Sequence, residues 1–488
     1  MPPPGLPDTA DAVVIGGGTV GAWCAYFLRG AGLDRVVVVE KGALGQGASS
    51  RAAGVVRLQG GTPAAVRLGL WSRRFYLGQR DEIGTDSGFV SQGYLLPCFT
   101  AAEVAAARDR AAMQAALGVP VVFLEPDEVD AVNPALAPGR TLGGTFCADD
   151  GFISPPRNVA AYTVALLRSG VTVAEHVAFR GLVRNGGQVT GVETSEGRVH
   201  APLVVLTGGP KLAQVGALAG IRIPAGGVRH QVAVTERHPD LHPARVPMVF
   251  DLSAGLYWRP EEGGLLFGMS NPGEPPGENR SVDEDYLARM RTRLATLVPV
   301  TQGLGLRRVW AATIDYTPDH LPIIGPALDR DGPLAGVTVA SAGGAGMMWG
   351  PAVARTAADV ALTGSSDVVD TTELGLDRFD ESGHSKLAGD LEDWGPLAEA
   401  TGEPMQTSGS TLWADGDQEV GVWECTPGPS YWTLETHEAI HILSGKMTVT
   451  PDGGAPLDIG PGDCAVFPRG WRGTWQIHET IRKLYVLY

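Results

Sequence analysis

The chain has 488 residues, which is enough for two or three domains with their own cores. Its formal net charge is −16 and it has no basic run, which argues against a nucleic-acid-binding surface. The five cysteines lie far apart, and we find neither a signal-peptide pattern nor an apolar run of membrane-spanning length. These features predict a soluble, cytoplasmic protein without a nucleic-acid or membrane partner.

The stretch 11–40 predicts a β-α-β unit with a phosphate-binding turn. Gly16 allows a sharp turn after the first strand, and Gly18 lets a diphosphate approach the backbone. Gly21 lets the following helix lie close to the strand. Glu40 ends the second strand, where a carboxylate accepts hydrogen bonds from a ribose diol. Together they indicate dinucleotide binding, whereas the glycines alone would fit a turn in another α/β unit.

A loop of small residues follows at 41–57. Its backbone amides and hydroxyl groups are suited to a second part of the same cofactor, although an ordinary surface loop is the alternative. We expect cofactor contacts from Lys41, Ser49, Ser50 and Arg51.

Helices are predicted for 62–82 and 101–117, with a strand-like segment at 88–99 between them. Short alternating runs from 171 to 201 predict a β-meander. The apolar strand after it ends in two glycines, Gly208 and Gly209, which suggests a return to the nucleotide-binding sheet with its backbone close to the cofactor.

Residues 222–310 predict an antiparallel sheet that forms a platform for a substrate, with an amphipathic helix at 283–297. A glycine-rich segment at 341–351 then opens a helix. The positive end of that helix would face an electron-rich group, such as the N1/C2 edge of a flavin. The residues expected to contact the cofactor here are Gly343, Gly344, Gly346 and Met347.

The order of these motifs resembles the D-amino acid oxidase superfamily over residues 10–380. The segments that carry the resemblance are the glycine turn, the meander, Leu206 to Gly209, Tyr257 to Glu261, Trp310 to Gly325 and the glycine-rich helix start. The most similar branch contains sarcosine oxidase β-subunits, dimethylglycine dehydrogenase and glycine oxidase. The resemblance implies an α/β, Rossmann-type FAD-binding domain with an antiparallel-sheet substrate domain. It also implies hydride removal beside an amine of a small amino acid or N-alkyl glycine.

Several family residues are replaced. Ala312 stands where monomeric sarcosine oxidase has its flavin-linking cysteine, and Arg51 where dimethylglycine dehydrogenase has a histidine, so non-covalent FAD is expected. Leu266 stands at an oxygen-activating lysine, and Ser270 at an active-site histidine. Met348 stands where monomeric sarcosine oxidase has a carboxylate-binding lysine. The electron acceptor is therefore oxygen or another acceptor.

A substrate carboxylate would need a cation, and arginine offers a planar fork for two oxygens. Arg57 aligns with a carboxylate-binding arginine of the family, and Arg259 lies near Tyr257 on the platform. We expect these residues and Met348 to form the catalytic site, with structural ion pairs as the alternative for the arginines. His230 is interpreted as structural, and no protein base is named.

Short β-runs separated by tight turns predict a small, all-β antiparallel barrel over about 397–488. This region resembles a cupin of the ureidoglycine-aminohydrolase-like type in Gly445, Gly460 to Asp463, Phe467 to Trp475 and Ile481 to Val486. Glu438 stands at a cupin metal-ligand position, but the histidine positions hold Trp432, Leu434 and Gly473. His437 and His441 would lie on the opposite face of the strand from Glu438 and could form a site only if the strand bulges, so no tightly bound catalytic metal is expected. The predicted boundaries are 1–380 for the oxidoreductase (FAD-binding about 10–56, 150–220 and 311–380; substrate region about 57–149 and 221–310), 381–396 for a linker and 397–488 for the cupin.

The sequence thus predicts an FAD-dependent amine oxidoreductase fused to a cupin, acting on a small-molecule amine or amino acid. Two alternatives are a dehydrogenase that passes electrons to a protein or quinone, and a flavin-binding or redox-sensing module without a substrate. Self-association through the cupin is a further expectation.

Overall fold

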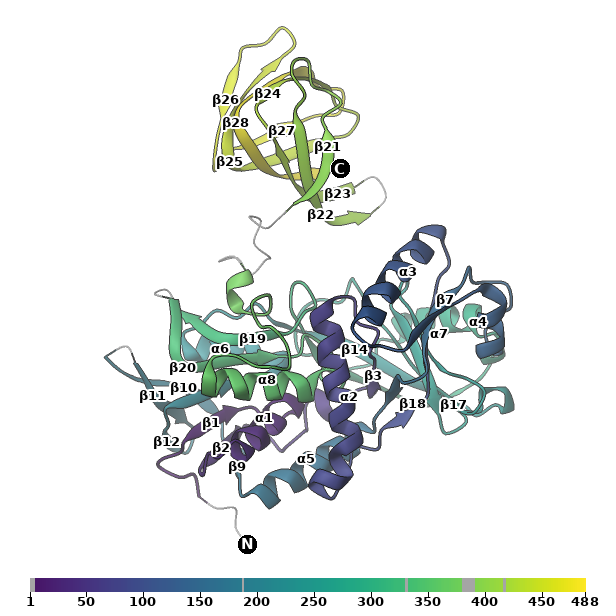
Figure 1. The fold of residues 1–488 in the computed structure, drawn as a ribbon, viewed down its shortest axis with the longest axis vertical. Helices are drawn as coiled ribbons and strands as arrows, with labels where there is room; N and C mark the ends of the chain where they lie inside the picture. Colours follow the sequence, from purple (N-terminus) through teal and green to yellow (C-terminus); the bar gives the residue numbers. More distant parts are fainter. Residues whose placement is uncertain (1–4, 187, 330–331, 380–390, 416–417) are drawn as a thin grey trace. The chain divides into compact units, whose positions relative to one another are not determined.

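The computed structural model describes residues 5–186, 188–329, 332–379, 391–415 and 418–488. The chain divides into two compact units, Met1–His384 and Ser385–Tyr488, which are treated separately below (Figure 1). The first is an α/β unit with an additional sheet that is antiparallel except for the parallel pair of β5 (Tyr94–Pro97) and β15 (Met248–Asp251), and the second is an all-β barrel; the sequence predicted both classes. No helix among the described residues is both long and apolar enough to cross a membrane.

A six-stranded sheet forms the nucleotide-binding part of the first unit, in the order β19-β20-β13-β1-β2-β9. Its strands are β1 (Ala12–Ile15), β2 (Val36–Glu40), β9 (Thr172–Glu175), β13 (Leu203–Leu206), β19 (Ile323–Asp329) and β20 (Gly332–Ser341). All neighbouring pairs are parallel except β19 with β20. The valine-rich strands are buried on both faces, which explains their continuous apolar runs.

Different elements cover the two faces of this sheet. Val14 lies in a core with residues of the helices α1 (Thr19–Gly30), α2 (Pro63–Ile83), α5 (Pro155–Ser169) and α8 (Gly350–Thr363). Val13 lies in a second core with residues of the predicted meander and of α6 (Leu212–Ala219). The meander consists of β10 (Phe179–Asn185), β11 (Gln188–Thr194) and β12 (Gly197–His200).

The predicted platform is part of an eight-stranded sheet in the order β18-β14-β17-β16-β15-β5-β7-β6. Its strands are β5 (Tyr94–Pro97), β6 (Val121–Leu124), β7 (Gly144–Cys147), β14 (Gly226–Thr235), β15 (Met248–Asp251), β16 (Leu256–Glu261), β17 (Gly264–Met269) and β18 (Leu306–Tyr316). Helix α7 (Glu284–Leu297) buries the predicted apolar face in the core of this sheet, and Asp283 caps it by accepting from Tyr286 N at 3.0 Å.

Shorter elements complete the first unit. They are α3 (Ala101–Ala116), α4 (Pro126–Val132) and a small sheet of β3 (Val55–Val56), β4 (Val90–Ser91) and β8 (Gly151–Phe152). The predicted helices at 62–82 and 101–117 are confirmed as α2 and α3.

The second unit is an antiparallel barrel with strands in the order β21-β22-β23-β28-β25-β26, while β24 pairs with β28 and β27 with β25. Its strands are β21 (Glu392–Pro396), β22 (Gln406–Asp415), β23 (Gln418–Cys425), β24 (Gly428–Thr433), β25 (Glu438–Pro451), β26 (Leu457–Ile459), β27 (Cys464–Phe467) and β28 (Arg472–Leu487).

The predicted linker at 381–396 is wrong at its C-terminal end, whereas its part up to residue 390 lies outside the described residues. Glu392–Pro396 forms β21 and pairs with β22. Trp394 lies so close to the backbone of Gly409 in β22 that a Cβ there would be 2.4 Å from its ring. The polar composition concealed this strand, because pairing with β22 decides its conformation.

Candidate functional site

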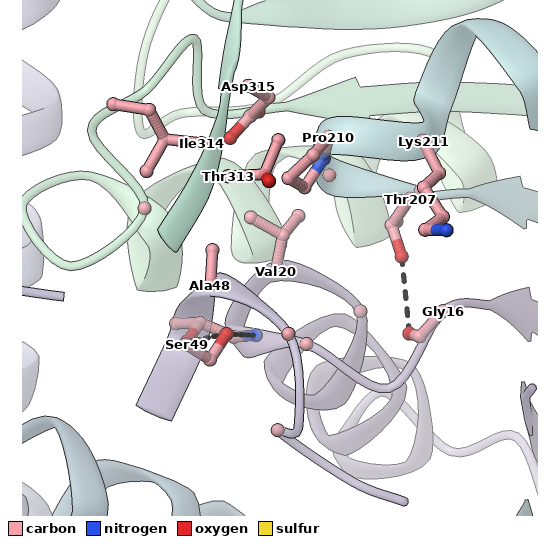
Figure 2. Close-up of a pocket in the computed structure, with 18 of the residues that line it drawn as sticks. Gly16, Val20, Ala48, Ser49, Thr207, Pro210, Lys211, Thr313, Ile314 and Asp315 are labelled. Atoms are coloured by element: carbon pink, nitrogen blue, oxygen red, sulfur yellow. Dashed lines mark hydrogen bonds between the residues drawn. The ribbon is translucent and has the colours of Figure 1, made fainter. Parts of the chain in front are cut away.

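A cavity of about 440 Å³ lies at the carboxyl ends of β1, β2 and β13, where α/β folds bind their ligands. Figure 2 shows Gly16 of the glycine turn joined to Thr207 by a hydrogen bond, with Pro210 and Lys211 also in the lining of the cavity. The residues predicted for the cofactor that line it are Gly16, Gly18, Gly21, Glu40, Lys41, Ser49, Gly208, Gly209, Gly346 and Met347.

Close backbone contacts at the glycine turn leave no room for a side chain. A Cβ on Gly16 would be 2.3 Å from the carbonyl oxygen of Thr207, and one on Gly21 would be 2.0 Å from that of Gly16. Gly16 also has φ of +106°, a backbone conformation that favours glycine. The start of α1 therefore lies beside the cavity with its backbone exposed to a ligand, as diphosphate binding needs.

Glu40 is held as an acceptor at the end of β2. Its Oε2 accepts from the amide of Gly17 at 2.7 Å, and its Oε1 accepts from that of Gly42 at 2.8 Å. Two amide donors fix the carboxylate at the cavity wall, where further lone pairs can take a ribose diol. The turn, the helix start and this acid together fit an adenine dinucleotide.

A row of cations on the cavity wall was not predicted, apart from Lys41. Lys211 forms an ion pair with Glu278, and Arg280 lines the same cavity. Burial, and then the neighbouring Lys211, lower the pKa of Lys41 to about 8. A bound diphosphate would offset this repulsion. Glu278 and Arg280 come from a loop distant in sequence, which explains why no local pattern indicated them.

A second cavity of about 220 Å³ adjoins the first, because Ala52, Ile314 and Met347 line both. Strand β18 serves both cavities by alternation: Thr313 and Asp315 line the first, while Ala312 and Tyr316 line the second. The predicted residues that line the second cavity are Arg51, Arg57, Tyr257 and Met348.

Arg57 is a cation in a largely aromatic wall. Its guanidinium carbon lies 5.2 Å from the ring centre of Phe250 and 5.9 Å from that of Tyr94. Its buried Nε has no hydrogen-bond partner, and among the described residues no carboxylate forms an ion pair with Arg57. The arginine therefore has capacity for an anion, such as a substrate carboxylate.

His230 and Tyr257 form an uncharged pair in this cavity. His230 Nε2 lies 3.0 Å from the hydroxyl of Tyr257, and the two rings are stacked 5.7 Å apart. Burial lowers the pKa of His230 to about 4 and raises that of Tyr257. The imidazole is therefore neutral near neutral pH and can only donate or accept hydrogen bonds. The sequence had suggested a purely structural role for His230.

Arg259 does not line either cavity, contrary to its predicted place in the site. Its Nε donates to the carbonyl of Ala53 at 2.8 Å, and its Nη1 lies 2.5 Å from Glu261. The side chain is 5% exposed and its guanidinium lies over the ring of Phe152. A carbonyl and a carboxylate already engage its guanidinium, so its position is that of a structural arginine.

Three residues predicted for the cofactor also lie outside both cavity linings: Ser50, Gly343 and Gly344. The two glycines have positive φ, and a Cβ on Gly343 would be 2.8 Å from the carbonyl oxygen of Leu321. They shape the turn before α8. The sequence missed Tyr94, Phe250 and Tyr316, because strands β5, β15 and β18 carry them from distant parts of the chain.

A cavity with a glycine turn and a terminal acid, adjoining an apolar cavity with an arginine, is the arrangement expected of an FAD-dependent oxidoreductase. Residues 11–360 match the family described as FAD dependent oxidoreductase, and the chain belongs to this family. FAD is its cofactor, as predicted. Residues 412–485 match the EutQ-like cupin domain, so the fusion is confirmed.

Three curated relatives illustrate the similarity. The chain is 29% identical to 4-methylaminobutanoate oxidase (formaldehyde-forming) of Paenarthrobacter nicotinovorans over 396 residues, which are 78% of this chain and 46% of that protein. It is 27% identical to mitochondrial dimethylglycine dehydrogenase of Homo sapiens over 65% of this chain and 39% of that protein. It is 29% identical to glycine oxidase of Pseudomonas putida over 66% of this chain and 87% of that protein. The chain thus spans less than half of the first two.

Solved structures show the same fold. L-proline dehydrogenase from P. horikoshii superposes with a TM-score of 0.69 at 26% identity, covering 74% of this chain and 96% of that one. Glycine oxidase from Geobacillus kaustophilus superposes with a TM-score of 0.67 at 26% identity, covering 77% and 100%. These superpositions agree with the membership of the chain in the FAD-dependent oxidoreductase family.

Proposed function

We propose that the protein oxidises the C–N bond of an N-substituted glycine or another small amino acid. The observation that carries this proposal is Arg57, an arginine that forms no direct ion pair with a carboxylate among the described residues, in a cavity that adjoins the first one. Relatives named as glycine oxidase and dimethylglycine dehydrogenase support the same substrate class.

In this proposal Arg57 binds the substrate carboxylate. His230 and Tyr257 line the same cavity and carry no formal charge near neutral pH. The apolar walls favour the neutral amine over the ammonium, because burial disfavours charge. A neutral amine has the lone pair that the reaction needs.

FAD supplies the hydride acceptor when it is bound. The substrate carbon loses a hydride, its nitrogen lone pair becomes the second C–N bond, and the nitrogen loses a proton if the product leaves as a neutral imine. Water then hydrolyses the imine to a carbonyl compound and an amine. Arg57 orients the carbon by its carboxylate, and Met347 lies where the two cavities meet.

The direct test is anaerobic mixing of the flavin-loaded protein with a panel of N-alkyl glycines and small amino acids. We expect the flavin absorbance near 450 nm, roughly, to bleach with at least one of them. Absence of bleaching by every member of the panel would contradict the proposal.

A second candidate concerns the acceptor, and Leu266 favours it. This side chain is 2% exposed and lies in an apolar cluster with Val232 and Val234, at the position of the oxygen-activating lysine of monomeric sarcosine oxidase. We infer a dehydrogenase that passes electrons to a protein or quinone. Formation of one equivalent of hydrogen peroxide per turnover would exclude it.

A further inference from the structure

The interior of the C-terminal barrel contains a carboxylate where cupins hold a metal. Strand β25 begins with Glu438, Ile440 and Ile442 pointing inward, and they are 5%, 3% and 1% exposed. Ala439 and His441 alternate with them and are only partly buried. Glu438 is therefore the inward carboxylate that the cupin resemblance places at a metal site.

A lysine already occupies the position next to this carboxylate. Lys483 of β28 donates from Nζ to Glu438 Oε1 at 2.6 Å, and its side chain is only 4% exposed. The same Nζ lies 4.7 Å from the ring centre of Trp423 and 4.3 Å from that of Trp475. An ammonium group is stabilised by such a carboxylate and by the faces of aromatic rings.

The residues around Glu438 do not fit a metal ion. Over the described parts of the chain, no three His, Cys, Asp or Glu side chains converge as a metal site would require. A bound transition metal usually has three or four protein ligands. A divalent cation at Glu438 would also be close to the Lys483 ammonium, and like charges repel strongly in a buried site.

The three described histidines of the barrel are engaged elsewhere. His437 stacks on Tyr488 at 5.2 Å, and its Nδ1 accepts from a backbone amide. His441 Nδ1 lies 3.2 Å from the sulfur of Cys464, and His478 lies 2.7 Å from the hydroxyl of Thr448. None of these contacts is with Glu438.

We propose that Lys483 is the internal cation of this cupin and takes the place of the metal ion at Glu438. The charge of the Lys483 ammonium balances that of the Glu438 carboxylate, and the rings of Trp423 and Trp475 lie beside the ammonium. Burial lowers the pKa of Lys483, while the Glu438 charge and hydrogen bond oppose that shift. The barrel is then complete without a metal and has no open coordination position for a catalytic one.

Metal content is the first test. The untagged, full-length protein is purified from cells supplied with manganese, iron, nickel and zinc, and its metals are measured by mass spectrometry. We expect less than about a tenth of an equivalent per chain, with no change in Glu438→Gln. Near-stoichiometric metal that is lost in Glu438→Gln would overturn the proposal.

Stability of the barrel is the second test, followed in the full-length protein by hydrogen exchange of barrel peptides during heating. Lys483→Met should lower the barrel midpoint by more than about 10 °C, because it leaves Glu438 buried without a cation. The double variant Lys483→Met/Glu438→Leu should recover most of this loss, and added manganese or zinc should shift no midpoint. Lys446→Met is the matched control, since Lys446 lies on β25 but is exposed and 3.5 Å from Glu479.

Two results would refute the internal cation. One is a Lys483→Met barrel as stable as the control, and the other is a wild-type barrel that added metal stabilises. If Lys483→Met does not fold, Glu438→Gln remains informative because it keeps the shape of the side chain. It should also lower the midpoint, and an unchanged midpoint would count against the pair.

Discussion

Replacement of Arg57 by methionine is the most direct test of the proposed substrate site. Methionine keeps much of the side-chain volume against Tyr94 and Phe250 but removes the charge. A hydrogen bond to a charged group contributes about 1.5–3 kcal/mol, and the substrate carboxylate would be buried without a partner. We therefore expect a loss of about 3 kcal/mol, which corresponds to roughly a hundredfold fall in kcat/KM.

The assay compares an amino-acid substrate with the corresponding amine that lacks the carboxylate. Wild-type protein should prefer the amino acid, and Arg57→Met should lose most of that preference while keeping its flavin. Arg73→Met is a suitable control, because Arg73 also lies near an aromatic ring, 5.7 Å from the centre of Phe89, but lines neither cavity. A change below about threefold in kcat/KM would remove Arg57 from the substrate site.

Four further outcomes are expected. Gly21→Val should yield protein without flavin, because its Cβ would be 2.0 Å from a backbone oxygen. The flavin absorbance band near roughly 450 nm should be absent, and retained flavin would contradict the turn geometry. Acid precipitation should release FAD to the supernatant, and flavin that stays in the pellet would show a covalent link. The unfolded imidazole of His230 binds a proton below about 6.5 and the folded one only near 4, so stability should fall as pH drops through this window, and His230→Asn should flatten that slope. Lys211→Met and Arg280→Met should each weaken FAD binding a few-fold at low salt by fluorescence titration, with smaller effects at high salt; salt-independent losses would argue against a charge effect.

Local patterns predicted many of the residues that line the first cavity. The glycine turn and Glu40 lie within 30 residues of each other, and their spacing alone determines a β-α-β geometry. The spacing of apolar residues three and four positions apart likewise indicated α7 and its buried face. In these segments neighbours along the chain are also neighbours in space.

The substrate cavity was harder to predict because its wall is assembled by sheet pairing. Tyr94 and Phe250 come together since β5 and β15 are adjacent strands, although more than a hundred residues separate them. Arg259 illustrates the opposite case, because its place in the sequence suggested the cavity but its side chain is not in the lining. It follows Tyr257 by two residues and shares its face of β16. Its guanidinium, however, donates to the carbonyl of Ala53 and to the carboxylate of Glu261, and these contacts hold it outside the cavity lining.

The alternation along β18 has a consequence for how this protein can change. Neighbouring positions from Ala312 to Tyr316 belong in turn to the substrate cavity and to the cofactor cavity, with Ile314 shared. Substitutions at Ala312 or Tyr316 can therefore reshape the second cavity, the proposed substrate site, while Thr313 and Asp315 keep their places in the lining of the first. A single inserted residue would exchange the two sets at once. Variation in this segment should thus proceed by replacement and not by insertion or deletion.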